Sequence, residues 1–336
     1  MLNYKIGILV DKPSEKNDTE GNSANQQKQI TAEKIKEALC EDYELSKITA
    51  DKKIIEKLRN SDVDIVFNLS TGVRGGSRQS QIPAIMEMIG IPYVGSGVLT
   101  HAMALNKAVA KKMFLYHNVL TPRFQVFATG KEEIDTDLNF PIIVKPACEG
   151  SGFGIHKDSV VNDKESLLKK VEELLKEYRP PILAEEFIKG REFTVGIIGN
   201  GDKKRILPIM EIDFKDIPEE YGKFYTFEVK SELGDQTRYY CPASLNKEQE
   251  KSIKKIASKA FDSLGCRDLA RIDIILKGGT PYVIEVNSLP GLQPVYSDLP
   301  KMADAAGISY KALINRILEE SVKRIKSKER RAVYGR

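Results

Sequence analysis

Short apolar runs, each bounded by polar residues, alternate with a helical pattern in the first third of the chain. Residues 5–10 and 63–68 form such runs and predict buried strands, while apolar residues at helical spacing predict a helix over 29–39. This alternation is typical of parallel β-α-β units. A polar stretch over 11–23 follows the first strand and predicts a loop, which is either a ligand-contacting loop or a mobile surface loop.

Glycine and proline residues between positions 90 and 97 follow a helix predicted over 79–89 and indicate a domain boundary. We therefore expect an N-terminal α/β domain at 1–97. A second unit, 98–181, carries predicted helices over 99–118 and from Asp163 to about Tyr178, with a strand over 141–145 between them.

The remainder, 182–326, is predicted to be richer in strands, followed by a basic tail over 327–336. Strands are expected over 182–186, 193–198, 205–211, 269–276 and 282–287. Asn246 and Gln249 have the spacing of a capping box at the start of a helix, and a last helix is expected from Ser309. The stretch 215–240 has no clear periodicity, which is typical of a lid or binding loop.

Composition narrows the class of protein. The 336 residues are 41% hydrophobic and 30% charged, which is typical of a folded globular protein. The longest apolar runs are too short to cross a membrane. The first apolar run is also too short for a secretory signal, so we expect a cytoplasmic protein.

The charge distribution and the cysteine and histidine spacing argue against a nucleic-acid-binding, membrane-binding or zinc protein. The net charge is +4, but residues 321–336 alone carry seven Lys or Arg and one Glu. Such a tail could contact nucleic acid or a membrane, or it could be a solvated helix end favoured by the helix dipole. Because the rest of the chain is not basic, we expect neither a nucleic-acid nor a membrane partner. The four cysteines and three histidines lack metal-ligand spacing, so reduced thiols and no zinc site are expected.

The most specific chemical pattern is R-I-D at 271–273 followed by E-V-N at 285–287. A hairpin centred on Gly279 would place Asp273 opposite Glu285 and Arg271 opposite Asn287, all on one face. Two carboxylates and a carboxamide at close quarters suit Mg²⁺ bridged to nucleotide phosphates, and the arginine could hold a phosphate or a developing oxyanion. A charged surface ladder is the weaker alternative, because the remaining strand positions are strongly apolar.

A second pattern joins a lysine to a glycine-rich loop. Lys145 ends a predicted buried strand, and E-G-S-G-F-G follows at 149–154. An ammonium and free backbone N–H groups can bind phosphates. The loop is neither a P-loop nor a dinucleotide-binding fingerprint, which argues against a nicotinamide-dependent oxidoreductase. The candidate nucleotide-binding residues of this loop are Glu149, Gly150, Gly152 and Gly154.

A third pattern places acidic residues within or beside apolar strands. Glu185, Glu186 and Glu192 lie in the segment 182–196. An adenosine needs an acceptor for its amino group or its ribose hydroxyls, and a glutamate can supply one. For Glu186 a solvent-facing position is the preferred interpretation.

In this order, the three patterns resemble the ATP-grasp superfamily, and most closely the D-alanine–D-alanine ligase family, from about residue 63 to 318. The resemblance implies an α/β (α+β) ATP-grasp fold, with an N-terminal parallel α/β domain and two α+β subdomains that clasp ATP. It implies an ATP-dependent ligase that converts a carboxylate to an acyl phosphate, which an amine attacks to form a peptide bond. ADP and phosphate are released.

The resemblance also assigns roles to residues. It places Lys107 and Lys145 on the ATP phosphates, with Glu185 and Glu192 on adenine and ribose. It implies that two Mg²⁺ or Mn²⁺ ions are held by the R-I-D and E-V-N segments. The resemblance further implies that Asp273, Glu285 and Asn287 are the metal ligands and that Arg271 and the Gly291 backbone stabilise the tetrahedral intermediate. It makes Lys230 the lysine of the lid and Ser151 a further catalytic residue.

The sequence departs from the family pattern where the family binds its amino acid. Thr71 and Gly76 stand in place of the usual histidine and glutamate, Ser231 stands in place of a tyrosine, and Glu15 is a weak counterpart of the usual amine-binding glutamate. The further substrate candidates are Arg74, Arg78 and Ser297. We expect small-molecule amino-acid or peptide substrates, joined as a pair other than two D-alanines. An ATP-binding module without ligase chemistry and a homodimer are left open.

Overall fold

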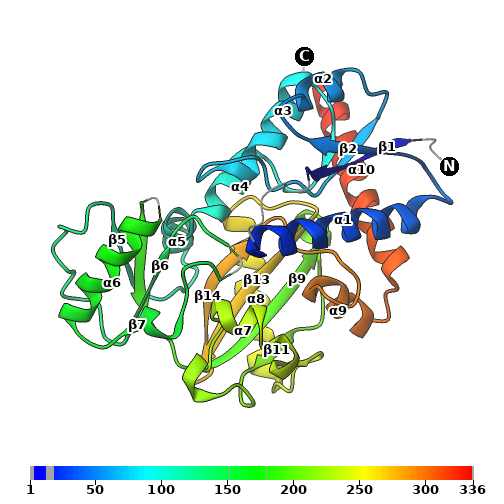
Figure 1. The fold of residues 1–336 in the computed structure, drawn as a ribbon. Helices are drawn as coiled ribbons and strands as arrows, with labels where there is room; N and C mark the ends of the chain where they lie inside the picture. The colour runs from blue at the N-terminus through cyan, green and yellow to red at the C-terminus, as the bar shows by residue number, and fades with distance from the viewer. Residues whose placement is uncertain (1–3, 13–18, 151, 179, 335–336) are drawn as a thin grey trace.

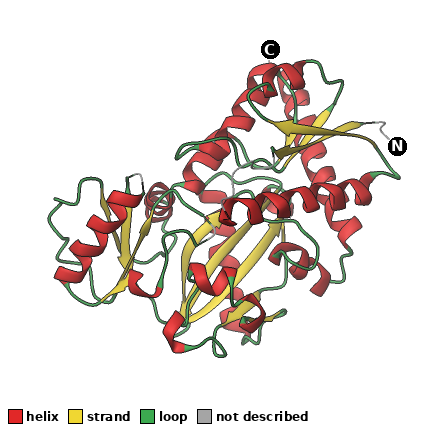
Figure 2. Cartoon of the chain, viewed as in Figure 1, coloured by secondary structure: helices red, strands yellow, loops and turns green. Residues whose placement is uncertain are grey.

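The structure is a computed structural model and describes residues 4–12, 19–150, 152–178 and 180–334. Three sheets follow one another along the chain, and Figure 1 shows them in blue, in green and in yellow-green to orange. Helices cover each sheet, as Figure 2 shows. No helix of the described residues is long and apolar enough to cross a membrane. This arrangement is the expected ATP-grasp fold.

The first sheet is parallel, with strand order β2-β1-β3-β4. Its inward-facing aliphatic residues form one core with α1 and the C-terminal helix α10 and a second core with α2 and α3. Both faces are therefore covered, as parallel sheets require. The elements are β1 (Lys5–Asp11), α1 (Thr19–Leu39), β2 (Glu44–Ala50), α2 (Ile54–Arg59), β3 (Ile65–Asn68), α3 (Gln81–Ile89), β4 (Tyr93–Val94) and α10 (Tyr310–Tyr334).

The second sheet is small and antiparallel, with strand order β5-β8-β6-β7. Helix α6 packs its apolar stripe against it, and Asp163 caps this helix as expected by accepting a hydrogen bond from the Ser166 N–H at 2.8 Å. The elements of this part are α4 (Val98–Leu105), α5 (Lys107–Tyr116), β5 (Phe124–Phe127), β6 (Ile142–Pro146), β7 (Val160–Val161), α6 (Lys164–Glu177) and β8 (Ile182–Glu186).

The third sheet is antiparallel, with the order β12-β11-β9-β13-β14, and β10 pairs with β9. Helix α8 packs on it, with the predicted capping box of Asn246 and Gln249 in place. The elements are β9 (Arg191–Ile198), β10 (Arg205–Ile206), β11 (Met210–Asp213), α7 (Phe227–Ser231), β12 (Arg238–Tyr240), α8 (Lys247–Ser263), β13 (Leu269–Lys277), β14 (Thr280–Asn287) and α9 (Asp298–Ala305).

Several predicted bounds are wrong. Helix α1 begins ten residues earlier than expected, so the polar stretch 11–23 is not one loop. The predicted helix 99–118 is two helices, because Asn106 leaves the helical conformation and its side chain caps α5 by accepting from the Val109 N–H. The predicted strand 205–211 is divided into β10 and β11. The break at Asn106 makes Lys107 the first residue of α5.

The hairpin of β13 and β14 has the predicted pairing at the site and a different pairing at the turn. Asp273 opposes Glu285, and Arg271 opposes Asn287. The turn itself is the two-residue loop of Gly278 and Gly279, both with positive φ, as the favoured hairpin turns require. A bulge between residues 273 and 274 shifts the register by one residue and restores the predicted pairs.

Candidate active site

A charged cluster lies on one face of the β13–β14 hairpin. Arg271 donates two hydrogen bonds to the Asp273 carboxylate, at 3.0 and 2.9 Å, and a third to Asp298 Oδ2 at 3.1 Å. Thr194 of β9 donates to Asp273 Oδ1 at 2.7 Å. The guanidinium is therefore held in one orientation by two elements, and the neighbouring carboxylates hold its pKa above the usual range despite burial.

The second carboxylate of the cluster is tied to the first through an amide. Asn287 Nδ2 donates to Asp273 Oδ2 at 3.0 Å and to Glu285 Oε1 at 3.2 Å. Lys107 Nζ lies 3.2 Å from Glu285 Oε2. Burial alone would raise the pKa of Glu285, but Lys107 and other nearby cations outweigh it and hold that pKa below the usual range. For Asp273, burial outweighs the attraction of Arg271, so its pKa is raised.

Lysines on two elements meet a buried glutamate beside this cluster. Glu185 of β8 forms ion pairs with Lys145 of β6 and, at 2.7 Å, with Lys111 of α5. Lys111 is fully buried and also donates to Thr121 Oγ1 at 2.6 Å. Its burial lowers the pKa of Lys111 to about 8, although Glu185 opposes the shift. Lys111 is not among the residues predicted from the sequence, where its only signal is its position one helical turn after Lys107.

The glycine-rich loop is attached to its surroundings on both sides. Lys107 Nζ donates to the Glu149 carbonyl at 2.6 Å, and Arg78 pairs with the Glu149 carboxylate at 3.0 Å. Gly152 and Gly154 have φ values of +82° and +71°. A Cβ on Gly154 would lie 2.6 Å from Cγ of Pro146, so the loop depends on glycine there.

The predicted lid packs against the glycine-rich loop. The Phe227 N–H of α7 donates to the Ile155 carbonyl at 2.8 Å, and the rings of Phe153 and Phe227 stack with centroids 5.6 Å apart. His156 Nδ1 lies 2.5 Å from Glu228 Oε1. Lys230 lies over the Tyr225 ring, 5.8 Å from its centroid. The glycine-rich loop and the predicted lid thus contact each other, and Lys107 joins the loop to Glu285 of the cluster.

The loop after β14 carries the last predicted residues. The Gln293 N–H donates to Ser297 Oγ at 3.1 Å, and a Cβ on Gly291 would lie 2.6 Å from this oxygen. Gly291 also lines a cavity of about 90 Å³ together with Lys28 and Thr71 from the N-terminal part of the chain. The carboxyl end of the first sheet therefore lies next to the loop that follows β14.

The other predicted site residues have the following places. Glu15 and Ser151 lie outside the described residues. Arg74 is exposed, and Arg78 is engaged by Glu149 as described above. Glu192 is partly buried, and burial together with the negative charge of Asp273 raises its pKa to about 8. Glu186 is also partly buried, and its Oε1 accepts a hydrogen bond from Asn139 Nδ2 at 2.7 Å.

Two α+β units that enclose lysines and a glycine-rich loop, beside an Arg–Asp–Glu–Asn face, define an ATP-grasp ligase. The family model described as "D-ala D-ala ligase C-terminus" matches residues 113–319. The D-alanine–D-alanine ligase of Syntrophotalea carbinolica is 35% identical over 289 residues, which are 86% of this chain and 89% of the relative. That of Pelotomaculum thermopropionicum is 32% identical over 331 residues, 95% and 96% of the two chains.

Solved structures agree with these relatives. The Bacillus anthracis D-alanine–D-alanine ligase complexed with ATP superposes with a TM-score of 0.75 at 28% identity, covering 97% of this chain and 99% of that one. The chain belongs to the D-alanine–D-alanine ligase family and is an ATP-dependent ligase that forms C–N bonds. An uncharacterised protein of Sinorhizobium fredii is also 35% identical, over 261 residues.

Proposed function

We propose that the protein joins the carboxylate of one small amino-acid or peptide substrate to the amine of another, through an acyl phosphate. One observation carries the proposal. The Arg271–Asp273–Glu285–Asn287 face lies in ion-pair contact with Lys107, next to the loop that a nucleotide phosphate would contact. Phosphoryl transfer needs little more than this positioning and charge stabilisation.

Each group then has a task in the reaction. Lys107 and Lys145 hold the β- and γ-phosphates while a substrate carboxylate oxygen attacks the γ-phosphorus and ADP leaves. The amine nitrogen then attacks the acyl carbon, and phosphate leaves as the C–N bond forms. Arg271, held by Asp273 and Asp298, and the Gly291 N–H stabilise the oxyanion of the tetrahedral intermediate. The lid with Lys230 excludes water from the acyl phosphate.

A divalent cation fits the donor set. Among the described residues there is no group of three or more His, Cys, Asp or Glu that could hold a metal. Mg²⁺ is instead commonly held by one or two carboxylates plus substrate phosphates, and the paired Asp273 and Glu285 with Asn287 offer such oxygen ligands. We propose that these residues hold two Mg²⁺ or Mn²⁺ ions, which would neutralise charge on the transferring phosphate.

Membership of the family does not by itself identify the two substrates. The relatives are named for D-alanine, so D-alanine is the first acid and amine to test. Thr71 faces Lys28 and Asp11 instead of forming the family's histidine contact, and Ser231 uses its hydroxyl to bond the Phe227 carbonyl. These departures support a preferred substrate pair other than two D-alanines. Cytoplasmic location and a homodimer stay predictions.

The experiment is a panel of carboxylate and amine pairs with the purified full chain and Mg·ATP. ADP release and the mass of the amide product are both measured, with Glu285→Ala as the inactive control. We expect a pair-dependent amide product formed together with ADP. ADP release that no acid stimulates, or stimulation without any amide, would contradict the proposal.

A further inference from the structure

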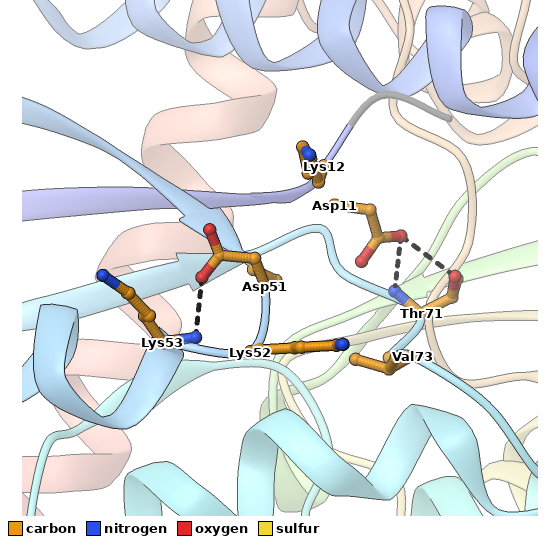
Figure 3. A pocket seen from close by; sticks show the side chains of 9 residues that line it. Asp11, Lys12, Asp51, Lys52, Lys53, Thr71 and Val73 are labelled. Carbon is orange, nitrogen blue, oxygen red and sulfur yellow. Dashed lines mark hydrogen bonds between the residues drawn. The ribbon is translucent and has the colours of Figure 1, made fainter. Parts of the chain in front are cut away.

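Two cavities meet at the carboxyl ends of the parallel strands in the N-terminal sheet. The smaller, about 90 Å³, lies between the end of β3 and the loop that contains Gly291. The larger, about 670 Å³, is lined by residues that end or follow β1, β2 and β3, and Figure 3 shows it from close by. Thr71 lines both cavities. A substrate whose carboxylate reacts beside Gly291 therefore has room to extend toward the larger cavity.

The described lining of the smaller cavity offers no carboxylate to the ammonium of an amino acid. Among the described residues that line it, none is acidic. The nearest carboxylate partner of its lysine is Asp11, which accepts from Lys28 Nζ at 2.5 Å, from Thr71 N and Oγ1 at 3.1 Å each, and from Ser70 Oγ. Three of these hydrogen bonds end on Asp11 Oδ2 and one on Oδ1, and the positive charge of Lys28 already neutralises the carboxylate. Among the described residues, an ammonium placed here would therefore meet no carboxylate that is free of a cation.

Donors, in contrast, are available at this junction. Lys28 uses two N–H groups on Asp11 and Thr71, at 2.5 and 2.6 Å, and an ammonium has a third. The Lys52 ammonium forms no hydrogen bond or ion pair within the described part of the chain, and Figure 3 shows it pointing toward Thr71 and Val73. Asp51, the other carboxylate of the larger cavity, is paired with Lys57 at 2.6 Å. The junction therefore presents a spare N–H donor on Lys28 and an unpaired ammonium on Lys52.

We propose that the acyl-donor substrate carries a second anionic group, a carboxylate or a phosphate, which Lys28 and Lys52 bind at this junction. This inference rests on the proposed ligase function and names the substrate class for it. The pairing of Asp11 with Lys28 and Thr71 fixes the Lys28 ammonium at the boundary of the two cavities, with side-chain exposures of 13% for Asp11 and 23% for Lys28. Lys52 is exposed and adds charge from the side of β2. The second anion of a dianionic acid then meets the two lysines, whereas the ammonium of an amino acid meets no uncompensated carboxylate among the described residues.

The test isolates the donor by using hydroxylamine as the amine, which converts any acyl phosphate to a hydroxamate with release of phosphate. The purified full chain with Mg·ATP receives D-alanine, D-lactate, D-aspartate, D-glutamate or phosphoglycolate, and ADP and hydroxamate are measured. We expect an acid with a second anionic group to exceed D-alanine in kcat/KM by about tenfold or more. Phosphoglycolate carries a phosphate as its second anionic group, whereas D-aspartate and D-glutamate carry a carboxylate, so comparing them shows which group the site prefers.

Matched variants identify the residues. Lys52→Ala should lower kcat/KM for the preferred acid by about fivefold or more, through KM, and leave the KM for ATP within about twofold. Lys53→Ala is the control, because Figure 3 shows Lys53 pointing away from Thr71. The inference is overturned if D-alanine or D-lactate is the best donor, or if the Lys52 and Lys53 variants behave alike. If D-alanine alone reacts, the ligase function stands and this inference fails; if no acid gives hydroxamate, both fail.

Discussion

The geometry of the glycine-rich loop predicts that one added methyl group, in Gly154→Ala, has a large effect. Gly154 has a φ of +71°, and an added Cβ would lie 2.6 and 2.7 Å from two ring carbons of Pro146 and 3.1 Å from Tyr178 Cε2. The left-handed conformation costs a residue with a Cβ about 1–2 kcal/mol. Forcing a carbon against the rigid proline ring adds about 1–3 kcal/mol. Gly154→Ala should therefore cost about 2–5 kcal/mol in total.

Two measurements are needed to account for this free energy. If the loop keeps its shape in the variant, the free energy of unfolding falls. If the loop moves, the affinity for the nucleotide falls instead. Urea unfolding gives the first part, and the ATP dissociation constant gives the second. Gly150→Ala is the control for stability, since Gly150 has an ordinary φ and no atom within 4 Å of its added Cβ. If the two losses for Gly154→Ala sum to less than about 1 kcal/mol, the loop is not shaped as described.

The remaining predictions concern charge. Glu285→Ala should lower turnover by about 100-fold or more at saturating Mg²⁺, because it removes a carboxylate from the metal set; turnover within about twofold of normal would refute that assignment. Lys145→Met and Lys111→Met each remove one partner of buried Glu185, so both should lower the free energy of unfolding by up to about 3–5 kcal/mol, but only the first should raise the KM for ATP by about tenfold. Equal KM values for the two variants would make Lys145 purely structural. Burial lowers the pKa of His101 to about 4, so the folded state resists protonation and stability should fall as pH decreases from about 6.5 to 4; His101→Asn should abolish that dependence in urea unfolding curves.

The placement of the charged residues on the third sheet could be predicted from local pattern alone. Strand alternation and a glycine turn place Arg271, Asp273, Glu285 and Asn287 on one face whether or not the rest of the fold is known. The bulge beside Asp273 could not be predicted, because no residue type there demands it. The strand pairing next to the turn is shifted by one residue and the bulge restores it, so the predicted pairing of these four residues is confirmed although the assumed centre of the hairpin is wrong.

The N-terminal part of the site depends on tertiary contacts that leave little trace in the sequence. Asp11, Lys28 and Thr71 come from a strand end, a helix and a loop, and nothing in their spacing predicts that they meet. The first half of α1 is so polar that it lacks a helical period, which hid its start and the position of Lys28 on it. The break at Asn106 could not be predicted either, because apolar residues continue at helical spacing on both sides of it. Only the capping side chain of Asn106 marks the start of the new helix.

Transfer of oxygen from the substrate to phosphate tests the central claim most directly. The acid that releases the most ADP is labelled with oxygen-18 in its carboxylate and ligated by the purified chain, and the released phosphate is analysed by mass spectrometry. An acyl-phosphate mechanism on the Arg271–Asp273–Glu285–Asn287 face predicts one labelled oxygen in each phosphate released with amide. Unlabelled phosphate, formed while ADP accumulates, would mean that water attacks ATP instead and would contradict the account.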